Sequence, residues 1–199
     1  MSDTGKMVLR TVITSGKSMK VSAKSMHEVE VLRRGKCYLT PFTVAHIDEV
    51  ASILSKENLE EISILGFDSP QEALLDMVES SDCYIARLDS GDILFVGGLW
   101  YGEDAELPQM FAMFSSKLKE NFTLMARGSK MLLHFFEKGH DTLTMTILTK
   151  HQAMVQWAVW LGFEPVGVYE DAGHQYIDFV RCNPNSKSVY DDTLRPAMH

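Results

Sequence analysis

The sequence predicts a mixed α/β (α+β) fold in which a central sheet is flanked by helices, with an extension at each end. Residues 142–182 read as a strand, an amphipathic helix and a hairpin, residues 82–100 read as a second hairpin, and segments with helical periodicity separate the strands. We therefore expect three parts: a basic N-terminal arm (residues 1–36), one domain (37–182) and a C-terminal tail (183–199).

The last unit of the domain has the clearest local signals. Thr142–Leu148 is a short β-branched and apolar run typical of an inner strand. Thr149 and Gln152 form a capping-box pattern for a helix that Gly162 should end. Residues 164–170 and 174–181 then predict a hairpin whose turn contains Gly173, a residue that accepts positive φ.

The first half of the domain alternates strand and helix signals. Residues 37–44 predict a strand, with Pro41 marking an edge or a bend. Apolar residues at helical spacing predict a helix over 45–54, which residues 58–64 should continue. Another helix should begin at Ser69, because Ser69, Pro70 and Glu72 occupy the N-cap, first and third positions.

The middle of the domain predicts a hairpin, a central strand and a long helix. Residues 82–88 and 93–100 flank a turn-forming segment, and Gly97-Gly98 indicates a bulge or a close backbone approach, with relief of strand twist as the expected purpose. Residues 108–115 predict the central strand. Apolar periodicity over 116–138 predicts one long helix with a weak point at Gly128.

These elements resemble a known superfamily. A strand, a helix that ends in Leu161-Gly162-Phe163 and a hairpin resemble the C-terminal half of the GCN5-related N-acetyltransferases (GNAT), and the upstream order agrees. The resemblance implies a mixed, mostly antiparallel central sheet. Within it, residues 64–67 (ILGF), 70–74 (PQEAL) and 80–84 (SSDCY) are similar to the acetyltransferase-like internal virion proteins of short-tailed bacteriophages. The resemblance covers roughly Cys37 to Cys182.

The resemblance also implies where a cofactor would bind. A GNAT enzyme has a glycine-rich loop between the central strand and the long helix, where backbone N–H groups and the helix N-terminus hold a diphosphate. The corresponding residues 114–121 (FSSKLKEN) contain no glycine, and Arg127-Gly128-Ser129 is expected inside the helix. We expect no cofactor. Acetyl-CoA is the alternative, with Ser115, Ser116 and Lys117 as binding candidates, because free N–H groups at a helix start attract anions.

The catalytic positions that the resemblance implies are also altered. The tyrosine that protonates the leaving thiolate corresponds to Ala158, and a common asparagine corresponds to His151. His151 is a candidate acid or base, although we expect it on the surface near the helix start. Glu106 is a candidate base in the acidic segment 103–106, for which we expect a solvated loop. No spacing of His and carboxylate residues indicates a metal site.

Composition limits the class of protein. The chain has 199 residues, 45% hydrophobic residues and a formal net charge of −8, which indicates a globular domain and argues against a general nucleic-acid binder. We expect no membrane span and no signal peptide, because no apolar run is long enough. The cysteines Cys37, Cys83 and Cys182 show no metal-binding spacing, so we expect free buried thiols in a reducing compartment.

The N-terminal arm has the opposite charge balance to the rest of the chain. Residues 1–36 hold eight basic residues against three acidic ones, and residues 8–13 and 29–32 are short β-branched runs that we expect to add to a sheet edge or to another subunit. We expect residues 1–36 and 183–199 to contact other virion proteins in an oligomeric assembly. A contact between the basic arm and phage DNA is a further hypothesis.

Two functions remain open at this point. The first is a structural or internal virion protein, head–tail or ejection-associated, built on a catalytically degenerate GNAT-like domain and found in the virion after assembly in the host cytoplasm. The alternative is an active N-acetyltransferase that transfers acetyl from acetyl-CoA to an amine. The missing glycines and the missing tyrosine favour the first.

Overall fold

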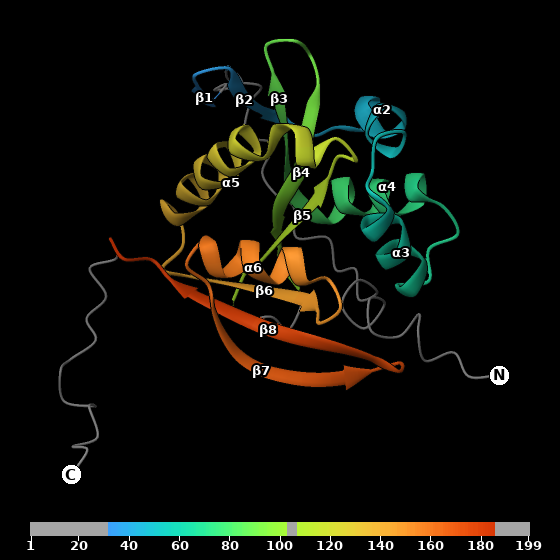
Figure 1. Cartoon of the computed structure of the whole chain (residues 1–199), viewed down its shortest axis with the longest axis vertical. Helices are drawn as coiled ribbons and strands as arrows, with labels where there is room; N and C mark the ends of the chain where they lie inside the picture. Colours follow the sequence, from blue (N-terminus) through green and yellow to red (C-terminus); the bar gives the residue numbers. More distant parts are fainter. Residues whose placement is uncertain (1–31, 103–106, 186–199) are drawn as a thin grey trace.

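The chain folds around one eight-stranded sheet with helices on both faces (Figure 1). The computed structural model describes residues 32–102 and 107–185. The strands are β1 (Leu32–Arg34), β2 (Cys37–Pro41), β3 (Ser81–Leu88), β4 (Ile93–Trp100), β5 (Gln109–Phe114), β6 (Thr142–Leu148), β7 (Glu164–Asp171) and β8 (His174–Cys182). The helices are η1 (Val44–His46), α2 (Ile47–Ala51), α3 (Lys56–Ile64), α4 (Pro70–Ser80), η2 (Leu118–Asn121), α5 (Phe122–Glu137) and α6 (Gln152–Trp160).

The sheet is mixed and mostly antiparallel, as the sequence predicts. Its strand order is β1-β2-β3-β4-β5-β6-β8-β7. Six of the neighbouring pairs are antiparallel, and β5 pairs with β6 in parallel. The parallel pair is short, since Gln109 and Thr144 are its single paired position. Strands β5 and β6 therefore diverge beyond that point.

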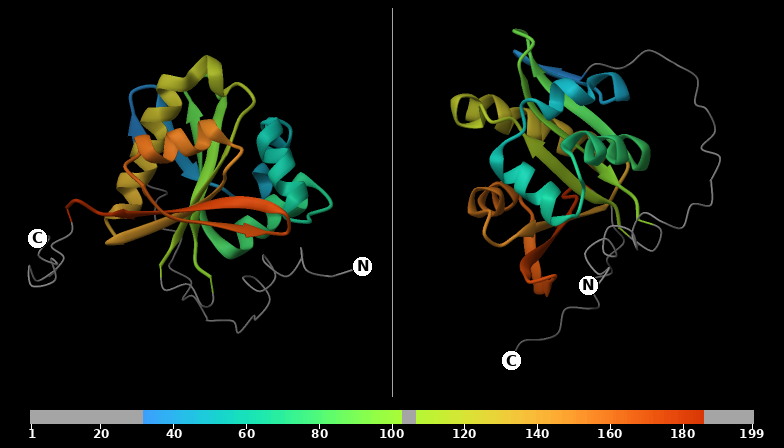
Figure 2. Two further views of the ribbon diagram at one scale, coloured as in Figure 1. Left: turned by 60° about the horizontal axis from the view of Figure 1, so that its bottom comes forward. Right: turned by 90° about the vertical axis from the view of Figure 1, so that its right-hand side faces the viewer.

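Two apolar cores lie on opposite faces of the sheet. Helices α5 and α6 cover one face, where Leu132 and Trp157 pack against Phe95 and Phe114. Helices α2, α3 and α4 cover the other face and bury residues such as Leu74 against β3 and β4. Figure 2 shows these helix layers on either side of the sheet. No helix among the described residues is long and apolar enough to cross a membrane.

The terminal strand–helix–hairpin unit and the middle hairpin have the predicted order and nearly the predicted bounds. The turn between β7 and β8 contains Ala172 and Gly173 at φ values of 47° and 77°. The predicted capping box is wrong in detail: His151 is the N-cap residue of α6, because Thr149 is drawn toward β8, where its amide and hydroxyl both donate to the carbonyl of Gln175.

Two predicted helices have different boundaries. Residues 45–64 form separate helices, because Leu54 makes a β-bridge with Ser115 and Ser55 then starts α3 as its N-cap. The helix predicted over 116–138 begins only at Phe122, after the short 3-10 helix η2. Gly128 is no weak point in α5. A Cβ there would lie 3.0 Å from the Phe95 ring and 3.1 Å from the Cys37 sulfur, so the glycine permits close packing.

Of the two alternatives for Gly97-Gly98, the close backbone approach is confirmed, since a Cβ on Gly98 would lie 2.5 Å from the carbonyl oxygen of Asp82. The bulge is wrong, because both glycines pair regularly with β5. Cys37 and Cys83 are buried free thiols as expected, whereas Cys182 is exposed because it ends β8 at the margin of the domain.

The described residues begin inside the segment predicted as an arm. Leu32–Arg34 form β1, which pairs with β2, and Leu32 packs against the larger core. Residues 8–13 and 186–199 lie outside the described residues, so the predicted contacts of the arm and the tail remain predictions.

Candidate functional site

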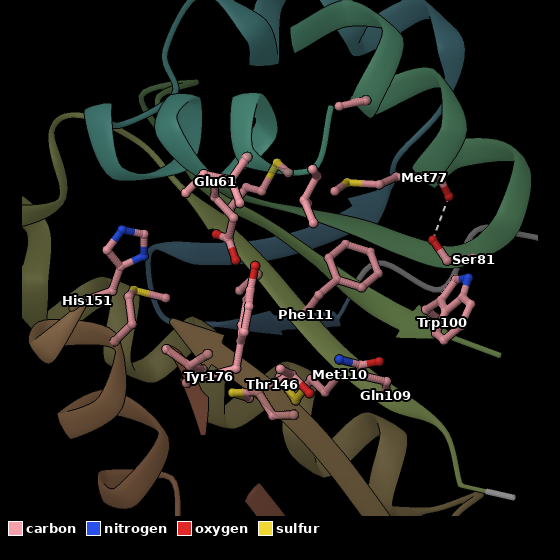
Figure 3. A pocket seen from close by; sticks show the side chains of 18 of the residues that line it. Glu61, Met77, Ser81, Trp100, Gln109, Met110, Phe111, Thr146, His151 and Tyr176 are labelled. Atoms are coloured by element: carbon pink, nitrogen blue, oxygen red, sulfur yellow. Dashed lines mark hydrogen bonds between the residues drawn. The ribbon is translucent and has the colours of Figure 1, made fainter. Parts of the chain in front are cut away.

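A cavity of about 340 Å³ opens where β5 and β6 diverge, beneath α3 and α4. Its wall is mostly apolar and rich in sulfur and aromatic rings, and Figure 3 shows several of these side chains around the opening. The apolar lining includes Phe67, Met77, Trp100, Met110, Phe111, Met113, Met145, Met154, Trp157 and Tyr169. Because these residues come from six different helices and strands and one loop, periodicity along the chain does not identify the cavity.

Glu61 and Tyr176 supply polar groups to this apolar cavity. Glu61 comes from α3 and Tyr176 from β8, and Figure 3 shows the carboxylate and the phenol hydroxyl pointing toward one another. Burial raises the pKa of Glu61 to about 7, and the positive charge of Lys150 offsets only part of that shift. Burial also raises the pKa of Tyr176 above its usual value, so its hydroxyl keeps its proton at neutral pH.

Sequence reasoning missed Glu61, although a signal was present. Asn58 and Ile62 are the buried residues of α3, and Glu61 lies three residues after one and one before the other. A carboxylate beside the buried stripe of an amphipathic helix is costly unless the site uses it. That spacing could have identified Glu61 from the sequence.

His151 also lines the cavity, so the expectation that it lies on the surface is wrong. The residue is 8% exposed, because the chain enters α6 directly from the buried strand β6. Its Nε2 lies 3.7 Å from a carboxylate oxygen of Glu60, and among the described residues this atom has no hydrogen-bond partner. The structure therefore brings His151 to the same cavity as Glu61, with one buried polar atom still unpaired.

The cofactor-binding candidates, Ser115, Ser116 and Lys117, follow β5 directly. The amide of Ser115 donates to the carbonyl of Leu94 at 3.0 Å, and the amide of Ser116 donates to the carbonyl of Ile53 at 2.7 Å. The amide of Lys117 donates to the hydroxyl of Ser115 at 3.3 Å. All three candidate amides thus have acceptors within the protein.

Other contacts hold this segment in place. The amide of Phe114, the last residue of β5, donates to the buried side chain of Asn58 at 2.7 Å. The Nζ atom of Lys117 forms an exposed ion pair with Asp92 at 3.3 Å. A diphosphate at this position would have to replace backbone hydrogen bonds that the fold already makes, so these residues do not fit a GNAT-type phosphate loop.

The remaining candidate positions that the structure describes give no acid or base. Arg127, Gly128 and Ser129 lie inside α5, as expected, and the hydroxyl of Ser129 accepts a hydrogen bond from Trp157 Nε1 at 3.2 Å. Ala158 is fully buried in the larger core. Glu106 lies outside the described residues. Within residues 32–102 and 107–185, no group of three or more His, Cys, Asp and Glu residues could hold a metal ion.

No family model matches the sequence, and no curated protein sequence matches it. Solved structures do match. A GNAT acetyltransferase of Bacillus anthracis has a TM-score of 0.61 at 9% identity, covering 77% of this chain and 98% of its own. A GCN5-related N-acetyltransferase of Brucella melitensis has a TM-score of 0.61 at 14% identity, covering 80% and 81%.

A third similar structure contains coenzyme A. It is the ribosomal L7/L12 α-N-protein acetyltransferase in complex with coenzyme A, with a TM-score of 0.59 at 13% identity, covering 77% of this chain and 98% of that one. Identities this low establish shared architecture and not shared chemistry. The chain has the fold of the GNAT acetyltransferases.

Proposed function

We propose that this chain is a catalytically degenerate GNAT-like domain that serves as a structural or internal component of a phage particle. One observation carries the loss of catalysis. The amides of Phe114, Ser115, Ser116 and Lys117 all donate within the protein, at the position where a GNAT enzyme would offer free amides to a diphosphate. Breaking such bonds without full replacement is costly, so the segment favours its closed form over a bound cofactor.

The role in a phage particle is supported by sequence. Residues 64–67, 70–74 and 80–84 resemble the acetyltransferase-like internal virion proteins, and the basic arm offers a docking segment with a charge opposite to that of the acidic chain. In this proposal residues 1–36 and 183–199 contact other virion proteins and the arm reaches phage DNA. The protein is made in the host cytoplasm and then resides in the virion.

The loss of cofactor binding is tested by titrating acetyl-CoA into the full chain and measuring heat. We expect no binding up to millimolar ligand. Acetyl-pantetheine, which lacks the diphosphate, is the matched control ligand. Micromolar binding of acetyl-CoA that exceeds binding of acetyl-pantetheine would show that the amides after β5 do hold a diphosphate, and the proposal would then be wrong.

The particle role is tested by deleting residues 1–31 and measuring the chain in purified particles by mass spectrometry. Residues 1–31 precede β1, so the deletion leaves every described element intact. We expect the full chain in the particles and the shortened chain only in the lysate supernatant. Equal amounts of the full and the shortened chain in particles would show that the protein does not dock through the arm.

A second function, N-acetyl transfer to an amine, is favoured by one observation. Glu61, with its pKa raised to about 7 in an apolar cavity, can accept a proton from an attacking amine near neutral pH. If this function holds, Glu61→Gln abolishes acetylation of an amine panel, while the exposed neighbour Glu60→Gln retains it. If the wild-type chain acetylates no amine of the panel, this alternative function is wrong.

A further inference from the structure

Strand β7 is an edge of the sheet that no other strand in the described part of the chain covers. It is the last strand in the order, pairs with β8 along its inner edge, and is exposed from Glu164 to Glu170. Val166 and Val168 are each 65% exposed. Strand edges of this length usually carry charges or a covering segment, because their free backbone groups attract another strand. Pro165 and the adjacent bulge blunt only the start of β7.

Helix α6 extends the apolar surface next to this edge. Val159 and Trp160 are about half exposed at the C-terminal end of α6, which contacts β7. Val168 pairs with Ile177, and Ile177 packs against the core beneath α6. Exposed apolar residues thus occur both on β7 and on the helix that contacts it, and exposed apolar surface is typical of an interaction site.

The charges on β7 discriminate between partners. Glu164, Glu170 and Asp171 are acidic, and the strand has no basic residue. If two copies of β7 paired antiparallel about Gly167, Glu164 of each would lie opposite Glu170 of the other, and like charges in that position are destabilising. That register is thus unfavourable for two copies of β7, whereas the acidic residues of the edge suit a basic, β-branched strand.

The N-terminal arm contains such a segment. Residues 6–13 (KMVLRTVI) combine two basic residues with β-branched and apolar ones, and residues 4–24 contain no acidic residue. In one antiparallel register Val8 lies opposite Val168 and Lys6 opposite Glu170. We infer that the outer edge of β7 takes residues 6–13 of a second copy of this chain as an added strand, an inference that rests on the docking role proposed for the arm.

The two edges lie at opposite ends of the sheet, which suits an arm that adds to a second copy of the chain. Residues 1–31 of the arm precede β1, which is the opposite edge of the eight-stranded sheet. Seven strand spacings, about 34 Å in all, separate β1 from β7. An arm that leaves one molecule at its β1 edge meets the β7 edge of the next, and this head-to-tail contact produces rings or filaments.

Sedimentation of the full chain across a concentration series tests the inference. We expect reversible association that deletion of residues 4–13 abolishes. Glu170→Lys should weaken association by about tenfold, because it replaces an attractive cross-strand pair by a repulsive one. Adding Lys6→Glu to that variant exchanges the two charges and should restore association. Glu120→Lys, the same charge change on an exposed residue of η2, is the control and should associate like the wild type.

Hydrogen exchange of the β7 amides gives the second measurement. We expect protection of residues 166–171 that rises with protein concentration. Association that survives deletion of residues 4–13 would overturn the inference. A protein that stays monomeric at every concentration would also overturn it, both if its β7 amides are unprotected and if its own arm protects them. If the β7 amides stay unprotected while incorporation into particles still requires the arm, the proposed function holds and β7 is not the docking site.

Discussion

The backbone amide of Ser116 donates a hydrogen bond of 2.7 Å to the carbonyl oxygen of Ile53. The bond joins the segment after the central strand to the junction between α2 and α3. Beside it, the amide of Ser55 donates to the carbonyl of Phe114 at 2.9 Å. The divergence of β5 and β6 is retained while the amides of the segment after β5 are hydrogen-bonded within the protein. This is the physical basis on which we propose that the chain keeps the fold without the catalysis.

Asn58 should be required to hold the segment after β5 against the junction between α2 and α3. Its buried side chain accepts the amide of Phe114 at 2.7 Å, so Asn58→Ala leaves a buried donor unpaired. We expect the free energy of unfolding to fall by about 1–3 kcal/mol in urea denaturation. Ser63→Ala, an exposed change on the same helix, is the control and should change stability by less than about 0.5 kcal/mol. Equal effects would show that the bond contributes little.

Glu61 should make stability depend on pH. Its pKa is about 7 in the folded protein against 4.5 for an ordinary glutamate, so the folded state binds the proton more tightly. This contribution is fully present below pH 4.5, is lost as the pH rises toward 7, and stays lost above that. Glu61→Gln should therefore gain stability over the wild type across that window, by at most about 3 kcal/mol.

The measurement is thermal unfolding of both chains from pH 4.5 to pH 8. Glu57→Gln in the first turn of the same helix is a comparison variant that changes charge away from the cavity lining. A difference between Glu61→Gln and the wild type that stays constant over the whole range would mean that Glu61 titrates normally.

Arg181 should be one of the most sensitive positions in the chain. Its Nε and Nη2 atoms each lie 2.7 Å from the carboxylate of buried Glu137, and its Nη1 donates to the carbonyl of Leu161 at 2.8 Å. Arg181→Ala leaves Glu137 without its main partner and the end of α6 without a donor. We expect a loss of about 3–5 kcal/mol in chemical denaturation.

An exposed ion pair provides the contrast for this prediction. Arg33 pairs with Asp89 at 2.6 Å with both side chains about half exposed. Arg33→Ala should cost less than about 1 kcal/mol, because solvent screens the pair. Similar losses for the two arginine variants would contradict the importance assigned to burial of Glu137.

Gly98 should not tolerate a side chain. A Cβ would lie 2.5 Å from the carbonyl oxygen of Asp82 and 2.8 Å from the ring of Phe111, so the paired strands must shift. Gly98→Ala should cost about 1–3 kcal/mol, measured as a lower midpoint of thermal unfolding. Gly139→Ala is the matched substitution, because its Cβ would meet nothing closer than 3.9 Å. A midpoint for Gly98→Ala equal to that of Gly139→Ala would disprove the steric argument.

Local patterns identified most of the elements. Alternation and β-branched residues located β6 and both hairpins, and Ser69 with Pro70 marked the start of α4, because these signals depend on a few neighbouring residues. The predicted boundaries are wrong where contacts with residues distant in the sequence determine the local structure. The bridge between Leu54 and Ser115 divides the helix predicted over 45–64, and the bond of Thr149 to β8 moves the cap of α6 to His151.

The residues of the candidate site were harder to predict from the sequence than the helices and strands. Ser115, Ser116 and Lys117 were found by their place after the central strand, but the acceptors of their amides lie at residues distant in the chain or are made by local folding. His151 was identified as a candidate from its position in the sequence, but the prediction that it lies on the surface was wrong. Glu61 and Tyr176 meet across the sheet from α3 and β8, and no spacing along the chain relates them.

The sequence by itself determined the order of strands and helices, the absence of glycine after the central strand and the basic character of the arm, because each is a property of residue types and near neighbours. Only the tertiary structure decided that the amides after β5 are occupied and that Glu61 lines an apolar cavity with a raised pKa. Hydrogen-bond partners and desolvation are set by groups brought together from distant segments, and they appear only once the chain has folded.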